Sequence, residues 1–178
     1  MEKTNIVLIG FMCSGKTSVA RILANMLNFD FIDTDILIEE RFNMSIDQIF
    51  NRYGEAFFRN QELQIAEKLR NDKFKVISTG GGMVLNPDIM NKLKVNGTIF
   101  WLKAPVKELL KRIDQNNNNR PLLTKANSYE IHMLYKKRRI LYERYCDYSI
   151  YTGQKTPKQI AQYIMNIYKK EVYPIQKK

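Results

Sequence analysis

The stretch GFMCSGKT, residues 10–17, constrains the fold of this chain more than any other part of it. It matches the pattern G-x-x-x-x-G-K-[ST], and it lies between an apolar segment at 5–10 and an amphipathic helical pattern at 16–27. In that setting, backbone N–H groups of the loop and of the helix N-terminus surround a phosphate, and a lysine adds charge. The motif therefore predicts nucleotide binding by a loop that joins a strand to a helix.

The loop also predicts which residues contact the nucleotide and its metal. A GTPase normally reads guanine with an N-K-x-D box, and the nearest string here, NKLK at 91–94, lacks the aspartate, so we expect ATP. The hydroxyl of Thr17 is placed to ligate magnesium. The expected ATP-binding residues of the loop are Cys13, Ser14, Gly15, Lys16, Thr17 and Ser18.

Short apolar segments alternate with helical patterns along the rest of the chain. This alternation predicts an α/β fold with three α/β/α layers, in which a parallel sheet is covered by helices on both faces. Its 178 residues fit one domain, 1–178. The expected strands are 5–10, 29–33, 74–79, 98–102 and 148–151. The expected helices are 16–27, 45–54, 55–70, one from Pro105 to about 113 and one from Pro157 to about 168.

The composition limits which kinds of partner and which cellular compartment are expected for this chain. An excess of 29 Lys+Arg over 18 Asp+Glu gives a net charge of +11, which favours nucleic acid, an acidic membrane face or phosphorylated small molecules. The longest apolar run, 6–13, is too short to span a membrane. Two cysteines without metal-ligand spacing predict a reduced, cytoplasmic setting. The basic string YKKRR at 135–139 lies in a helical pattern, and the end of the chain, about 171–178, is interpreted as a frayed basic tail.

One long segment, DQNNNNRPLLTKANS at 114–128, is polar and has no periodicity. A stretch of this length inside a compact domain is typically either a functional lid or disordered. We interpret it as a mobile lid over about 114–126.

Asp33 and Asp35, in FIDTDILIEE, allow two interpretations. They suit a helix cap and a first-turn acid, since Asp is favoured at both places. Alternatively, Asp33 ends the strand beside the phosphate loop and holds magnesium, directly or through water. If the segment is extended, the side chain of Asp35 points in the same direction as that of Asp33, about 6 to 7 Å away from it. This separation leaves room for a transferring phosphoryl group between the metal and the acceptor.

Six short motifs follow one another along the chain. They are GFMCSGKT at 10–17, DTD at 33–35, FFRNQE at 57–62, STGGG at 78–82, RPLL at 120–123 and RRILY at 138–142. Each later motif is weak alone, but the ordered set is specific, and it covers about residues 5–165. Taken in order, these motifs resemble those of the shikimate kinase family.

The resemblance implies a five-stranded parallel sheet of the nucleoside-monophosphate-kinase type and a monomer. It implies that shikimate is bound by Asp35, Arg59, the Gly81 backbone and Arg138, with the two arginines on the carboxylate. It implies that Arg120 reaches from the lid to the ATP phosphates, and that the adenine surface comprises Arg112, Lys155 and Pro157. Arginine is suited to binding the shikimate carboxylate because it binds planar carboxylates through two parallel hydrogen bonds.

The expected reaction is ATP-dependent phosphorylation of the 3-hydroxyl of shikimate, a step of chorismate and aromatic amino-acid biosynthesis. Lys16, Arg120 and magnesium would stabilise charge while Asp35 orients the hydroxyl. The sequence departs from the family at Cys13, where most members have glycine, and the 112–120 segment is one residue longer than is common. Three alternatives remain: a gluconate kinase of the same architecture, a nucleic-acid-binding ATPase, and an inactive relative that only binds.

Overall fold

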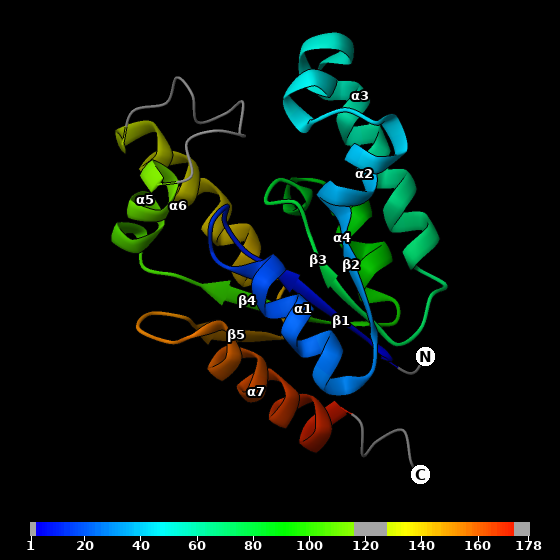
Figure 1. Cartoon of the computed structure of the whole chain (residues 1–178), viewed down its shortest axis with the longest axis vertical. Helices are drawn as coiled ribbons and strands as arrows, with labels where there is room; N and C mark the ends of the chain where they lie inside the picture. The colour runs from blue at the N-terminus through cyan, green and yellow to red at the C-terminus, as the bar shows by residue number, and fades with distance from the viewer. Residues whose placement is uncertain (1–2, 116–127, 173–178) are drawn as a thin grey trace.

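The structure, a computed structural model, describes residues 3–115 and 128–172. Its centre is a five-stranded sheet in the order β2-β3-β1-β4-β5, and every pairing is parallel (Figure 1). This order places β1, which leads into the phosphate loop, in the middle of the sheet with β3 on one side and β4 on the other. The strands are β1 (Asn5–Ile9), β2 (Asp30–Asp33), β3 (Lys75–Ser78), β4 (Gly97–Lys103) and β5 (Tyr148–Tyr151).

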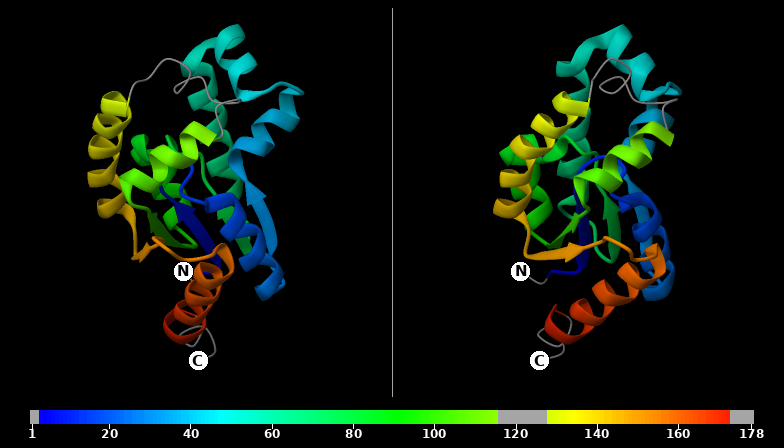
Figure 2. Two further views of the ribbon diagram at one scale, coloured as in Figure 1. Left: turned by 60° about the vertical axis from the view of Figure 1, so that its left-hand side comes forward. Right: turned by 90° about the vertical axis from the view of Figure 1, so that its left-hand side faces the viewer.

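Helices cover both faces of this sheet (Figure 2). Helices α1 and α7 pack together on one face, while α3, α4 and α6 contribute to the core on the other. The predicted three-layer fold is therefore confirmed. The helices are α1 (Lys16–Leu27), α2 (Thr34–Phe42), α3 (Ile46–Leu69), α4 (Pro87–Lys94), α5 (Val106–Gln115), α6 (Ser128–Tyr145) and α7 (Pro157–Ile167), with short turns η1 (Met83–Leu85) and η2 (Tyr168–Val172).

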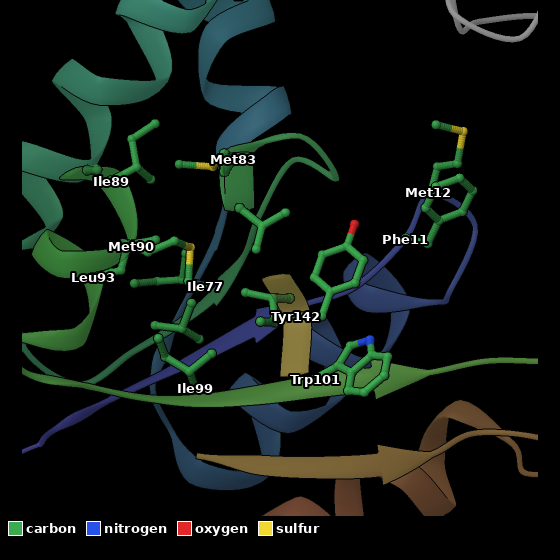
Figure 3. Packing of buried hydrophobic residues seen from close by; sticks show 14 of the residues in the cluster. Phe11, Met12, Ile77, Met83, Ile89, Met90, Leu93, Ile99, Trp101 and Tyr142 are labelled. Atoms are coloured by element: carbon green, nitrogen blue, oxygen red, sulfur yellow. The ribbon is translucent and has the colours of Figure 1, made fainter. Parts of the chain in front are cut away.

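The central strand supplies side chains to two hydrophobic cores. Because successive side chains of a strand point to opposite faces, Ile6 and Leu8 pack under α1 and α7, whereas Val7 and Ile9 pack on the other side. All five residues of β1 are buried, as expected for a strand covered on both faces. Figure 3 shows the second core, in which the ring of Trp101 on β4 stacks on the ring of Tyr142 on α6.

The predicted elements agree with the structure to within one or two residues in most places. Helix α1 covers the predicted 16–27, and α3 is interrupted at Gly54, whose φ of 82° separates the two predicted helices 45–54 and 55–70. Pro105 precedes α5 by one residue instead of opening it, while Pro157 is the first residue of α7. Helix α4 was not predicted, and α2 starts where the helix-cap interpretation of Asp33 places a helix.

Parts of the chain with predicted roles lie outside the described residues. These are most of the lid, 116–127, and of the basic tail, 173–178. Among the described helices, none combines the length and the apolar composition that crossing a membrane requires.

Candidate active site

The phosphate loop connects the carboxyl end of β1 to the first turn of α1. Gly15 caps this helix with a φ of 92°, a backbone conformation that glycine adopts without strain. A Cβ at Gly10 would lie 2.9 Å from the carbonyl oxygen of Leu102, so this position also requires glycine. The Nζ of Lys16 donates hydrogen bonds to the carbonyl oxygens of Gly10 (2.9 Å) and Phe11 (3.0 Å). The lysine is thus held over the loop by two of the loop's own carbonyl groups.

Cys13 departs from the family glycine and still adopts a glycine-like conformation. Its φ is 59°, in the left-handed region that a side chain disfavours. Its carbonyl oxygen accepts a hydrogen bond from Nη1 of Arg112 on α5 at 3.2 Å. The loop therefore keeps its shape with cysteine at this position.

A cavity of about 600 Å³ opens over this loop. We call it the loop cavity. It lies between the start of α1, helix α5 and the start of α7, and its walls include every predicted ATP-binding residue within the described chain. The lining residues are Cys13, Ser14, Gly15, Lys16, Thr17, Ser18, Val19, Arg112, Lys155, Pro157 and Ile160. Arg120, the remaining predicted ATP contact, lies outside the described residues.

Oxygen atoms from three elements meet at the side chain of Thr17, one of the residues that line this cavity. The Thr17 hydroxyl donates to Oδ2 of Asp33 at 2.8 Å, and the Ser78 hydroxyl lies 3.4 Å from the Thr17 hydroxyl. Hard oxygen donors are the ligands that Mg²⁺ prefers, and Mg²⁺ usually takes only one or two from the protein. Within 3–115 and 128–172, no cluster of three His, Cys, Asp or Glu residues could hold a metal. The residues present fit a magnesium ion completed by phosphate and water.

The helix-cap interpretation of Asp33 is confirmed, the magnesium interpretation stays a prediction, and the extended geometry predicted for Asp35 is wrong. Strand β2 ends at Asp33, which caps α2: its Oδ1 accepts from the backbone N–H groups of Asp35 (3.1 Å) and Ile36 (3.4 Å). Capping these N–H groups starts a helix at Thr34, so Asp35 lies in a first turn and not on an extended segment. Oδ2 of Asp33 stays directed at Thr17, and one carboxylate both caps the helix and faces the loop.

A second cavity, of about 290 Å³, lies between the phosphate loop, α2, α3, α6 and the glycine turn at 80–82. We call it the acceptor cavity. It combines carboxylates, cations and an apolar wall. Its lining includes Asp35, Glu39, Glu62, Lys16, Arg59, Arg138, Met12, Ile36, Ile46, Phe50 and Phe58. Lys16 and Thr17 line both cavities, so the two spaces meet at these side chains.

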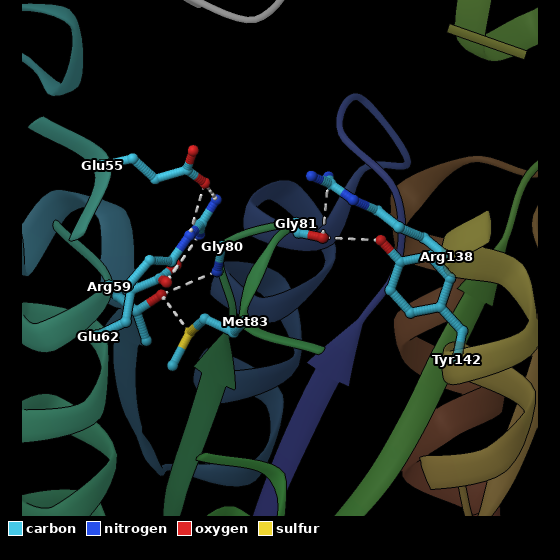
Figure 4. Close-up of polar contacts among 9 residues, drawn as sticks. Glu55, Arg59, Glu62, Gly80, Gly81, Met83, Arg138 and Tyr142 are labelled. Atoms are coloured by element: carbon cyan, nitrogen blue, oxygen red, sulfur yellow. Dashed lines mark hydrogen bonds and ion pairs between the residues drawn. The ribbon is translucent and has the colours of Figure 1, made fainter. Parts of the chain in front are cut away.

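The glycine turn is closely surrounded by the charged side chains of this cavity (Figure 4). A Cβ at Gly80 would lie 2.5 Å from Oδ1 of Asp35 and 3.0 Å from Oε1 of Glu62, and one at Gly82 would lie 2.5 Å from Nη1 of Arg59. Any side chain at these two positions would displace a charged group. The glycine run therefore lets the backbone approach the cavity without displacing these groups.

Arg59 is held by carboxylates on its own helix. It pairs with Glu55 at 2.9 Å and with Glu62 at 2.8 Å. The side chain of Glu62 is only 1% exposed, and its Oε1 has no hydrogen-bond partner among the described residues. The pKa of the Glu62 carboxyl is raised to about 7, first by burial and then by the charge of Asp35, and Arg59 opposes both effects. We assigned no role to Glu62 from the sequence; its i+3 spacing from Arg59 was the available signal.

Arg138 reaches the same cavity from α6. The guanidinium of Arg138 is buried, lies 5.9 Å from the ring centroid of Phe11, and donates from Nη1 to the Gly81 carbonyl at 3.2 Å. Its desolvation lowers the pKa of Arg138. The structure thus brings Arg59, Arg138, Asp35 and Gly81, all predicted substrate contacts, around one space.

Comparison with known proteins identifies the family that this arrangement represents. Residues 12–169 match the family model described as shikimate kinase. The chain belongs to the shikimate kinase family. The shikimate kinase of Thermodesulfovibrio yellowstonii is 43% identical over 167 residues, which cover 93% of this chain and 95% of that protein. That of Caldicellulosiruptor saccharolyticus is 40% identical over 164 residues, 92% of this chain and 95% of the relative.

Solved structures agree with this assignment. The shikimate kinase of Acinetobacter baumannii in complex with shikimate superposes with a TM-score of 0.87 at 36% identity, covering 92% of each chain. The enzyme from Aquifex aeolicus gives 0.81 at 36% identity, over 93% of this chain and 96% of that one. A gluconokinase from Sinorhizobium meliloti, at 14% identity and a TM-score of 0.61, shares the fold alone. The predicted fold and shikimate kinase activity are confirmed.

Glu62 makes the stability of this shikimate kinase depend on pH. The carboxyl pKa is about 7 in the folded chain, compared with 4.5 for a free side chain. The contribution of the neutral carboxyl to the free energy of unfolding is therefore fully present below pH 4.5 and is lost as the pH rises through 7. A shift of this size corresponds to about 3 kcal/mol, or roughly 5 to 10 °C in Tm. We expect Glu62→Gln, which cannot ionise, to gain stability relative to wild type between pH 4.5 and 7.5. Parallel Tm profiles from thermal melts at half-unit pH steps would contradict this.

Cys13 lines the loop cavity, so the alkylation rate of its thiol can be used to test whether MgATP binds there. A nucleotide seated there would cover the thiol, so we expect MgATP to slow alkylation of Cys13 about tenfold or more while Cys146 reacts at an unchanged rate. The rates are measured by mass spectrometry of peptides after timed exposure to iodoacetamide. Equal protection of both thiols, or of neither, would place the nucleotide elsewhere.

Proposed function

We propose that this shikimate kinase binds ATP in the loop cavity and shikimate in the acceptor cavity, and transfers the γ-phosphoryl group to the 3-hydroxyl where the cavities meet. The observation that carries this proposal is that Lys16 and Thr17 line both spaces. A phosphoryl group passing from one substrate to the other needs a cation and an in-line path, and this junction supplies both.

On the nucleotide side, the phosphates lie on the N–H groups of residues 13–18, and the adenine contacts Arg112, Lys155 and Pro157 at the far end of the cavity. Thr17 and Asp33 hold Mg²⁺ directly or through water. The ion, when bound, neutralises charge that develops on the transferring group. Lys16 leaves the carbonyl groups of Gly10 and Phe11 to reach the outer phosphates.

On the acceptor side, an anionic polyol matches the lining of the cavity. Arg59 and Arg138 bind the carboxylate of shikimate, and the Gly81 backbone adds a further contact. Asp35, in the first turn of α2, accepts the hydrogen bond of the 3-hydroxyl and takes its proton as the phosphoryl group arrives. Ile36, Ile46, Phe50 and Phe58 cover the apolar side of the ring.

The lid, about 114–126, completes the site in this proposal. Arg120 reaches the ATP phosphates when the lid closes, and closure excludes water that would otherwise accept the phosphoryl group. Lys16, Arg120 and Asp35 are then the catalytic residues.

We also infer that the protein acts as a cytoplasmic monomer on small molecules, without nucleic acid or membrane. Both cysteines are free thiols in the described chain, as a reducing compartment requires. The acceptor cavity has a volume of about 290 Å³, which suits a small molecule and not a polynucleotide.

A coupled assay of ADP formation tests the proposal. We expect turnover with MgATP and shikimate, turnover at least about 10²-fold slower with gluconate, and no stimulation by RNA or DNA. ATP hydrolysis that ignores shikimate and rises with nucleic acid would contradict it. Omitting Mg²⁺ with a chelator should abolish the shikimate-dependent rate.

A further inference from the structure

The carbonyl oxygen of Gly81 accepts hydrogen bonds from two side chains of α6. The hydroxyl of Tyr142 donates to it at 2.9 Å, and Nη1 of Arg138 donates at 3.2 Å (Figure 4). A carbonyl oxygen has two lone pairs, so this pair of donors satisfies it completely. Arg138 lines the acceptor cavity, whereas Tyr142 stands behind the glycine turn in the core.

Tyr142 is fixed in place by its surroundings. It is 1% exposed, and its ring stacks on the ring of Trp101 with centroids 5.9 Å apart and planes 24° apart. An aromatic side chain has two torsions, and this packing holds both. The position of the Tyr142 hydroxyl is therefore set by the sheet and α6, independently of what occupies the cavity.

The Gly81 residue that Tyr142 anchors also touches the phosphate loop. A Cβ at Gly81 would lie 3.4 Å from the backbone nitrogen of Met12 and 3.8 Å from Nη1 of Arg138. The glycine turn is thus placed between α6 and the loop, and a shift of Gly81 would move the backbone that faces the substrate.

One of the five N–H donors of Arg138, on Nη1, is used by Gly81, and its Nε is buried without a hydrogen-bond partner among the described residues. A guanidinium that turns to place two donors on an arriving carboxylate would weaken its bond to Gly81. Leaving a partly buried carbonyl with no donor costs free energy, so the second donor from Tyr142 makes this movement of Arg138 easier.

We propose that Tyr142 is a positioning residue for the acceptor substrate: its hydroxyl holds the Gly81 carbonyl so that Arg138 is released to bind the substrate carboxylate. This rests on the proposed placement of shikimate in the acceptor cavity. Tyr142 contacts no substrate, and it acts through Gly81 and Arg138.

The variant Tyr142→Phe removes the hydroxyl and keeps the ring that stacks on Trp101. We expect KM for shikimate to rise about tenfold, with kcat within threefold of wild type and KM for ATP unchanged. Isothermal titration with shikimate, which needs no turnover, should show the same loss of affinity. A shikimate affinity equal to wild type overturns the proposal.

Tyr135→Phe is the matched control. Tyr135 lies on the same helix, is 8% exposed, and packs edge-on against Phe11 with centroids 5.5 Å apart. We expect this variant to leave both KM values unchanged. If Tyr135→Phe weakens shikimate binding as much as Tyr142→Phe does, or if Tyr142→Phe raises both KM values together with a fall in Tm, the effect is general destabilisation and the proposal is wrong. Absence of shikimate-dependent turnover in wild type would instead overturn the proposed function.

Discussion

Asp35→Asn is expected to lower shikimate-dependent turnover by about 10² to 10⁴, the range that removal of a general base produces. The amide keeps the shape of the side chain but cannot accept a proton from the acceptor hydroxyl. The loop cavity does not include Asp35, so KM for ATP should change less than twofold. Steady-state rates at saturating shikimate, measured by coupled ADP release, provide the comparison.

The matched control is Asp88→Asn. Asp88 occupies the first turn of α4, as Asp35 does in α2, but it lines neither cavity. Loss of a first-turn charge costs a helix about 0.3 to 1 kcal/mol, so both variants should lose a similar small amount of stability. Near-wild-type turnover of Asp35→Asn would remove Asp35 from the chemistry.

Arg138→Lys is expected to raise KM for shikimate roughly 10- to 150-fold, the equivalent of about 1.5 to 3 kcal/mol for a charged hydrogen bond. Lysine keeps the charge but loses the planar fork that binds a carboxylate through two parallel hydrogen bonds. KM for ATP should be unchanged, because Arg138 lies in the acceptor cavity only.

Arg139→Lys separates this effect from a general change on α6. Arg139 is the next residue, is exposed, and pairs with Glu143 at 3.0 Å. We expect its kinetic constants to match wild type within twofold, since exposed pairs of this kind contribute about 0.5 kcal/mol. Equal KM values in the Arg138 and Arg139 variants would contradict the assignment of the carboxylate to Arg138.

The loop and the sheet could be predicted from the sequence because their signals are local. The phosphate-loop motif spans eight residues, and its strand and helix follow directly from the apolar periodicity on either side. Helix α1 accordingly has the predicted bounds. Helix α2 was indicated only by the possible cap at Asp33, because Ile36, Leu37 and Ile38 are consecutive and give no helical period. Helix α4 was not predicted, since it has only eight residues.

The position of Asp35 shows how local and tertiary constraints combine. The sequence allowed a helix cap or a metal partner for Asp33, and it predicted an extended geometry for Asp35. In the structure Oδ1 of Asp33 caps α2 while Oδ2 faces Thr17, so the cap leaves one carboxylate oxygen directed at the loop. Which carboxylate oxygen faces which partner depends on how β2 and α1 lie in space, and no spacing along the chain encodes that.

Glu62 and Tyr142 could be identified only in three dimensions. Both lie in or beside motifs that the sequence singled out, yet their roles come from burial: the raised pKa of Glu62 is due first to desolvation, and the Tyr142 hydroxyl acts on a carbonyl 61 residues away. Desolvation depends on every element around a side chain, so it follows from the assembled fold.

A crystal structure of the protein with shikimate and MgADP tests the central claim most directly, namely that the acceptor cavity holds the substrate between Asp35 and the two arginines. We expect the shikimate carboxylate on Arg59 and Arg138, the 3-hydroxyl within hydrogen-bonding distance of Asp35, and ADP over residues 13–18. Shikimate bound outside this cavity, or with its carboxylate directed away from both arginines, would contradict the account.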